Sequence, residues 1–209
     1  MVRRPRWGDD EPADDAAARE RLLLAAEICY ERMGIAGSSV EDIARQAGVH
    51  RTTVYKFFAG RDDILTAVLL RESEGVIARA EETFASTHSF VEAVVPALVR
   101  AMNDIASSRY LRLLLTSESA AMTMRVATAS QEFRSRVARA ITGPAHEAQR
   151  DSELRSDVSL DELVDWLVRL TFVLAPEAAA SPDHAARMLS LFVLPALVPG
   201  AASVPILPR

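Results

Sequence analysis

The stretch from Ser39 to Leu65 constrains the fold of this chain more than any other. Ser39 and Asp42 form a Ser-x-x-Asp start signal, in which the side chains pair with amides that the first helical turn leaves unpaired. Apolar residues then recur at i, i+3, i+4 and i+7, the stripe of a short amphipathic helix, at Val40, Ile43, Ala44 and Ala47. Gly48 marks a sharp turn, because glycine enters left-handed backbone conformations without a steric penalty. A second short helix over about 50–58 follows, so the stretch predicts two helices joined by a tight turn.

The second helix carries groups that suit DNA. No acidic residue occurs between Gly48 and Arg61, whereas basic residues and hydroxyls alternate there. Arginine and lysine neutralise phosphate, and Thr and Tyr hydroxyls donate to phosphate oxygens. A helix-turn-helix lays its second helix in the major groove, with base contacts from the N-terminal residues of that helix. The predicted DNA-binding residues are Ser39, Val40, His50, Arg51, Thr52, Thr53, Tyr55, Lys56 and Arg61.

The chain resembles the DNA-binding domain of TetR-family transcriptional regulators over about residues 22–70. The resemblance lies in the order Val-Glu-Asp-Ile-Ala…Ala-Gly-Val…Thr-Val-Tyr-x-x-Phe…Arg-Asp-Asp-Ile-Leu. It implies a three-helix DNA-binding head on an all-helical, ligand-sensing, dimeric body. It makes Tyr55 a phosphate-contacting tyrosine, gives Arg61 the place of a phosphate-binding lysine, and matches Arg51 and Thr52 to base-reading positions.

Two positions of this chain depart from the family pattern. His50 stands where a small capping serine or threonine is common, and Phe57 replaces a frequently polar residue. These departures do not change the expected fold, but they prevent a prediction of the operator sequence.

Composition supports a helical body. The chain of 209 residues is 49% hydrophobic and has only eight glycines and ten prolines, which favours long helices around a core. Its formal net charge of −5 speaks to solubility, whereas DNA binding depends on the local basic patch. We predict an all-α fold with a flexible arm, a helix-turn-helix domain, a helical ligand-binding and dimerisation domain, and a flexible tail, over 1–13, 14–60, 61–198 and 199–209.

Periodicity and capping signals place the other helices. The first should buttress the turn-helix pair and stop at Gly34, and the long one should begin after Gly60 with acids that complement the helix dipole. Residues 119–142, followed by Gly143-Pro144 and a charged continuation, fit either two helices or one interrupted helix. The predicted helices, in order, cover about 15–33, 61–86, 90–107, 109–116, 160–174 and 182–194.

Two features near the N-terminus leave alternatives open. Arg3, Arg4 and Arg6 suit either a basic arm in the minor groove or a solvated tail. Cys29 is the only cysteine, so no disulfide can form within one chain. It fits a small buried hydrophobe, with a redox-sensing thiol as the alternative.

The sequence contains no catalytic pattern. The four histidines stand apart, without metal-ligand spacing, and neither a Gly-rich phosphate loop nor a Gly-x-Ser-x-Gly elbow occurs. No apolar core of a signal peptide follows the basic N-terminus, and no apolar run reaches the length of a membrane span. We therefore expect a cytoplasmic protein that is not an enzyme, with no cofactor, metal or membrane partner.

The second half of the chain offers apolar candidates for two further sites. Methionine and aromatic residues suit an adaptable pocket among helices, although each singly also fits the core. The predicted ligand-binding residues are Met102, Leu114, Met122, Met124, Phe133, Trp166 and Phe172. Apolar stripes near the end favour a four-helix interface between two copies. The predicted dimer residues are Leu163, Leu167, Leu170, Leu174, Met188, Leu189 and Phe192.

Together these features predict a homodimeric DNA-binding transcriptional regulator. We expect a repressor that a small apolar effector releases from a palindromic operator in double-stranded DNA. One alternative is an activator or a DNA-binding protein controlled by a protein partner. A helical carrier or enzyme with a non-functional DNA-binding head is the alternative from a different class.

Overall fold

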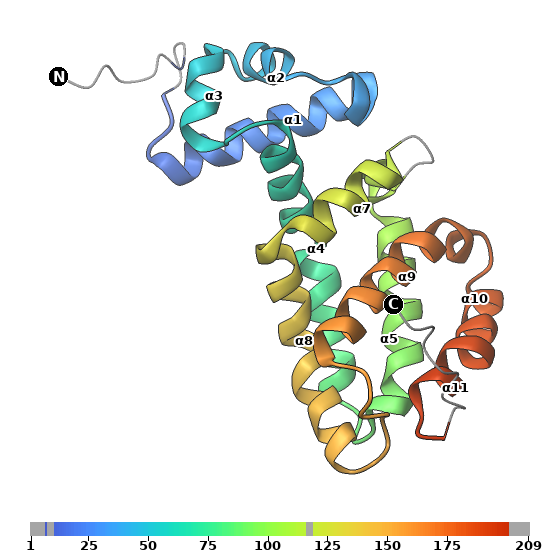
Figure 1. Ribbon diagram of the computed structural model, residues 1–209. Helices are drawn as coiled ribbons and strands as arrows, with labels where there is room; N and C mark the ends of the chain where they lie inside the picture. Colours follow the sequence, from blue (N-terminus) through green and yellow to red (C-terminus); the bar gives the residue numbers. More distant parts are fainter. Residues whose placement is uncertain (1–6, 8–10, 116–118, 201–209) are drawn as a thin grey trace, which may run out of the picture. The chain divides into compact units, whose positions relative to one another are not determined.

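The computed structural model describes residues 7, 11–115 and 119–200, and all regular elements within them are helices (Figure 1). The predicted all-α fold is confirmed. The helices are α1 (Asp15–Gly37), α2 (Val40–Ala47), α3 (Arg51–Phe57), α4 (Arg61–Ala85), α5 (Phe90–Ser107), α6 (Arg109–Leu114), α7 (Ala120–Ala129), α8 (Gln131–Arg150), α9 (Leu160–Ala180), α10 (Pro182–Met188), the π-helix η1 (Leu189–Val193) and α11 (Leu194–Leu197). In this part of the chain, no helix combines the length and hydropathy that crossing a membrane requires.

The chain folds into two compact units. Among the described residues, unit 1 comprises those up to 73 and those from 108 to 130, and unit 2 comprises 74–107 and those from 131 onward. The sequence suggested a head that ends at residue 60. Unit 1 is larger than this predicted head, because it also includes the first half of α4 and the helices α6 and α7.

Ion pairs link α6 and α7 to other helices of unit 1. Arg109 of α6 forms an ion pair with Glu31 of α1, with Nε and Oε1 2.6 Å apart. Arg125 of α7 pairs with Asp62 of α4 at 3.0 Å. These partners lie far apart in the sequence, so helical periodicity gave no sign of them.

The first helix begins and bends at residues that the sequence singled out. The Asp14 carboxylate accepts a hydrogen bond from the amide of Ala17 at 2.8 Å and caps the helix. Gly34, where we expected the helix to stop, has φ +73° and produces a kink, after which α1 continues to Gly37. Leu22 and Tyr30 of this helix are fully buried in unit 1.

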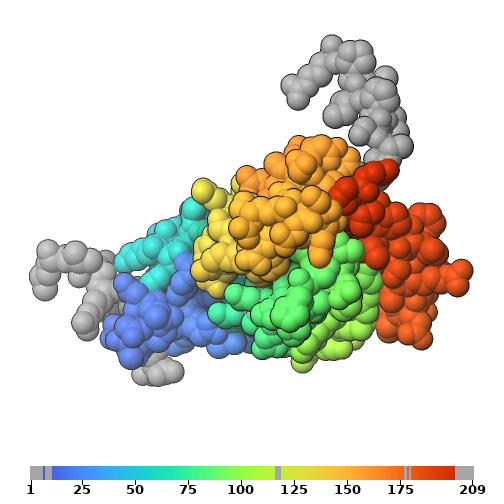
Figure 2. Space-filling view, turned by 90° about the horizontal axis from the view of Figure 1, so that it is seen from below, coloured from blue at the N-terminus to red at the C-terminus, as the bar shows by residue number. Residues whose placement is uncertain are grey.

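Unit 2 is built around the packing of α5 against α9, with α8 against α9 and α10 and α11 against α5. Figure 2 shows one face of the molecule, on which green, orange and red segments of this unit lie side by side. Phe84 stacks on Phe90 with ring centroids 5.2 Å apart, where α4 gives way to α5. Phe133 of α8 meets Phe172 of α9 edge to face at 6.3 Å. These aromatic pairs fill the interior with large apolar surfaces.

Several helices in the described part of unit 2 contain a proline in their interior or in their first turn. Pro144 lies inside α8, so the stretch 119–142 and its continuation form two helices, broken at Ser130 instead of at Gly143-Pro144. Pro96 lies inside α5. The last predicted helix changes from α to π bonding over η1, and Pro195, which has no amide hydrogen, lies in the first turn of α11.

Candidate nucleic-acid interface

The start of α2 is fixed by a reciprocal cap. The Ser39 hydroxyl accepts from the amide of Asp42 at 3.2 Å, and the Asp42 carboxylate accepts from the amide of Ser39 at 3.1 Å. The Ser39 hydroxyl and amide, and then Arg45, hold the pKa of the Asp42 carboxyl below its usual value. Hydrogen bonds to the charged form of a carboxyl favour that form.

The turn between α2 and α3 needs its glycine. Gly48 adopts φ +72° and ψ +31°, the left-handed conformation that costs other residues free energy. The amide of Val49 then donates to the carbonyl of Ala44 at 2.9 Å, which closes the end of α2. Together the cap and the turn set the direction in which α3 leaves α2.

The inner faces of α2 and α3 are packed into unit 1. Ile43, Val54 and Phe58 are at most 1% exposed. The guanidinium of Arg19, from α1, lies 4.2 Å from the centroid of the Phe58 ring and donates to the carbonyl of Phe57 at 2.9 Å. This packing leaves α3 only one face that solvent or DNA can reach.

The outer face of α3 carries most of the predicted DNA contacts. The exposed residues are His50, Arg51, Thr52, Tyr55 and Lys56, and Ser39 at the start of α2 is half-buried. Tyr55 keeps 50% of its surface accessible, a high value for an aromatic side chain. Three of these five side chains can carry positive charge, and no acid occurs on α3.

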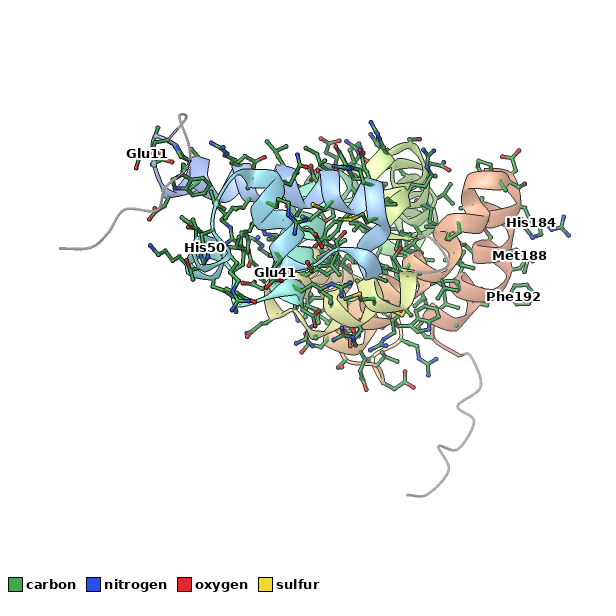
Figure 3. The ribbon with its side chains drawn as sticks, turned by 90° about the horizontal axis from the view of Figure 1, so that it is seen from above. Glu11, Glu41, His50, His184, Met188 and Phe192 are labelled. Atoms are coloured by element: carbon green, nitrogen blue, oxygen red, sulfur yellow. The ribbon has the colours of Figure 1, made fainter. Side chains whose placement is uncertain are left out.

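His50 acts as the N-cap of α3, and Figure 3 shows it at the outer start of that helix. Its Nδ1 accepts from the amide of Thr52 at 3.4 Å and lies 2.9 Å from the Thr52 hydroxyl. The departure from the family's usual serine or threonine therefore preserves the capping function with a different side chain.

Arg51, the first residue of α3, is engaged by an acid from α2. Its Nη1 donates to Oε1 of Glu41 at 2.9 Å, and both side chains are about half exposed. This hydrogen bond is the first cause of the lowered pKa of the Glu41 carboxyl.

Three of the predicted DNA-binding residues have side chains that are buried or bonded within unit 1. The side chains of Val40 and Thr53 are 7% and 4% exposed and belong to the core, because they occupy the inner faces of α2 and α3. The guanidinium of Arg61 donates to the carbonyl of Ile35 and has its Nη2 3.8 Å from the sulfur of Met122. Arg61 is thus held between α1 and α7, by partners 26 and 61 residues away in the sequence.

Trp7 is a structural residue that the sequence did not reveal. It lies in the segment predicted as a flexible arm, yet it is 4% exposed. Its ring meets Phe57 of α3 edge to face at 6.1 Å, and the Arg21 guanidinium lies 5.6 Å from its centroid. Trp7 is therefore the packing partner of Phe57, the apolar residue at a position that is usually polar in the family. The basic residues of the predicted arm, Arg3, Arg4 and Arg6, lie outside the described residues.

The predicted ligand-binding residues are divided between the two units. Leu114, Met122 and Met124 belong to unit 1. Unit 2 contains the others: Met102, Phe133 and Phe172, which are buried, and Trp166, which is 40% exposed. Trp166 lines a surface groove of about 510 Å³ in unit 2. Polar residues and apolar ones, among them Leu154, Val158 and Leu197, line the rest of the groove.

The predicted dimer residues also differ in exposure. Leu163, Leu167 and Leu189 are buried in the core of unit 2, and Leu170 and Leu174 are half-buried. Met188 and Phe192 are 37% and 66% exposed. Figure 3 shows them, with His184, projecting from one side of α10 and η1. Three further exposed apolar residues lie on α9 and η1: Trp166, Val173 and Leu191.

The described residues contain no group of three or more side chains that could ligate a metal ion. The candidate site in the described residues is a helix-turn-helix in which the exposed face of α3 carries no acidic residue.

Known proteins share both the head and the whole fold. A family model described as "Bacterial regulatory proteins, tetR family" matches residues 22–68. The HTH-type transcriptional regulator SrpR from Pseudomonas putida is 25% identical over 182 residues, which are 86% of this chain and 83% of SrpR.

Two solved structures have a similar fold. A TetR-family transcriptional regulator from Pectobacterium atrosepticum has a TM-score of 0.62 and 18% identity, over 90% of this chain and 98% of that one. FadR from Bacillus subtilis, in complex with stearoyl-CoA, has a TM-score of 0.56 and 19% identity, over 88% and 99%. With the capped α2, the glycine turn and the exposed α3 face, these likenesses lead to one conclusion: the chain belongs to the tetR family of bacterial regulatory proteins and is a DNA-binding transcriptional regulator.

Proposed function

We propose that this protein is a homodimeric repressor that a small apolar ligand releases from a palindromic operator. The observation that carries the proposal is the outer face of α3, where Arg51, Thr52, Tyr55 and Lys56 are all exposed. Arg51 and Thr52, at the start of the helix, are the candidates for base contacts, and Tyr55 and Lys56 the candidates for phosphate contacts.

The proposed dimer uses the exposed apolar surface of α9, α10 and η1. Its members are Trp166, Val173, Met188, Leu191 and Phe192. Burying such side chains contributes roughly 25 cal/mol per Å² of apolar surface. An isologous pair of these surfaces would present two α3 helices to half-sites one DNA turn, about 34–36 Å, apart. Leu163, Leu167 and Leu189 support this surface from within the protomer.

We propose an apolar effector because the side chains in the interior of unit 2 are apolar. Met102, Phe133 and Phe172 are buried there on three helices, α5, α8 and α9. FadR, which shares the fold, was solved with stearoyl-CoA, a molecule with a long acyl chain. A small, highly charged metabolite would lose hydration on entry without gaining a charged partner.

In the proposed mechanism, ligand binding shifts α4 and changes the separation of the two α3 helices. Coupling free energies of this kind are typically about 1–3 kcal/mol, which lowers the affinity for the operator about 5- to 150-fold. The ligand can act only if it binds the released conformation more tightly than the DNA-bound one.

The test uses the purified wild-type protein and the DNA that flanks its own gene. A gel shift that resists non-specific competitor DNA would support operator binding. Long-chain acyl compounds and flat aromatic compounds should then raise the melting temperature of the protein and release the DNA. Release by a phosphorylated sugar, with no effect of the apolar compounds, would contradict the proposed pocket. Stabilisation without release would contradict the proposed induction.

A further inference from the structure

We infer that Glu41 is a specificity-determining residue that acts through Arg51, by orienting its guanidinium and lowering its attraction to phosphate. The inference rests on the operator binding proposed above. It gives an acidic residue of α2 a role in DNA recognition. An acidic side chain would not be expected among residues that only contact phosphate, because the two charges repel each other.

The geometry brings the two groups together from different helices. Glu41 lies in the first turn of α2 and Arg51 at the first position of α3, ten residues later. Nη1 of Arg51 donates to Oε1 of Glu41 at 2.9 Å. The backbones that carry them are held by the Ser39 cap and by the His50 cap, so the ion pair spans two fixed helix starts.

The remaining donors of Arg51 are the ones that base reading needs. A guanidinium has five N–H groups in one plane, and its paired donors fit the O6 and N7 atoms of guanine. With one Nη1 donor occupied by Glu41, the guanidinium has less rotational freedom. Less entropy is then lost when the other donors meet a base.

The charge of Glu41 acts against phosphate. Arg51 without an acidic partner would attract any DNA backbone, independent of sequence. Glu41 cancels part of that charge through the ion pair with Arg51. Its carboxylate should therefore weaken sequence-independent binding more than operator binding, which increases the ratio of the two.

The pair can be altered without unfolding the head. Glu41 and Arg51 keep 49% and 59% of their side-chain surface accessible, and an exposed ion pair contributes little to stability. The residues that hold the backbone of α2, Ser39 and Asp42, remain in place in every variant below.

The experiment starts from an operator selected with the wild-type protein. Dissociation constants for that operator and for a scrambled duplex are measured over a range of salt concentrations, for wild type, Glu41→Gln, Arg51→Ala and the double variant. Glu41→Gln should bind the scrambled duplex more tightly and lower the operator-to-scrambled ratio about tenfold, within the range that one base contact contributes. Its salt dependence should steepen by about 0.9 per DNA-contacting head.

Three controls separate this role from a simple charge effect. Glu41→Asp keeps the charge with a shorter reach, so it should keep the wild-type salt dependence. Glu82→Gln changes the net charge equally at an exposed position of α4 and should leave the ratio unchanged. With Arg51→Ala present, Glu41→Gln should have no further effect on the ratio.

An unchanged ratio in Glu41→Gln would overturn the inference, and so would an effect that persists in the Arg51→Ala background. If the wild-type protein selects no duplex at all, the operator binding fails instead, and that result is distinguishable from both.

Discussion

Replacing Arg61 distinguishes an internal role from a phosphate contact. Its guanidinium donates to the carbonyl of Ile35 on α1 and lies 3.8 Å from the sulfur of Met122 on α7. Arg61→Ala removes a hydrogen bond from a charged donor, which typically contributes about 1.5–3 kcal/mol. For a chain of this length each kcal/mol corresponds to about 2–4 °C in melting temperature. We therefore expect Arg61→Ala to lower the melting temperature by roughly 3–12 °C.

Two measurements check this expectation. Thermal unfolding followed by circular dichroism should show the loss for Arg61→Ala, and Arg32→Ala, at an exposed position of α1, should show almost none. At a temperature where both variants are folded, the salt dependence of DNA binding should match that of the wild type. A wild-type melting temperature together with a salt slope smaller by about 0.9 would refute the internal role and restore the phosphate contact.

Three further predictions concern the dimer, the N-terminal anchor and acid stability. Phe192→Glu should yield a folded monomer by sedimentation, whereas Leu167→Glu, with a charge in the core, should cost about 3 kcal/mol or more of stability; a dimeric Phe192→Glu would contradict the interface. Trp7→Ala should lower the melting temperature by emptying the site against Phe57, and an unchanged value would show that the contact is not needed. The pKa of Asp42 is lowered in the fold, so its contribution is present above the unfolded pKa of about 4 and lost as the pH falls through the folded value. Asp42→Asn should therefore flatten the fall in stability below about pH 4, and an unaltered acid limb would contradict this.

Local signals in the sequence predicted the helix-turn-helix well. The Ser39 cap, the Gly48 turn and the inward positions of α2 each depend on residues within a few positions of one another. Hydrogen bonds of this range follow from residue type and spacing. The outer face of α3 followed from the same periodicity.

Contacts between distant segments could not be predicted in this way. Arg61 and Trp7 find partners on other helices, and the sequence shows only that a basic and an aromatic residue are present. Periodicity identifies the apolar face of a helix, but it does not show whether other helices of the same protomer bury that face or leave it exposed. Leu167 and Phe192 come from similar apolar stripes, yet Leu167 is buried in the protomer core and Phe192 faces solvent.

The role of α3 as the recognition helix is tested most directly by a binding-site selection from random duplexes with wild type, Arg51→Ala and Tyr55→Phe. We predict that the wild type selects a palindrome with half-site centres about one helical turn apart. Arg51→Ala should lose about 1–3 kcal/mol of discrimination at one position of each half-site, and Tyr55→Phe should bind every duplex more weakly with the ranking kept. Full specificity in Arg51→Ala would contradict the assignment of α3 as the recognition helix.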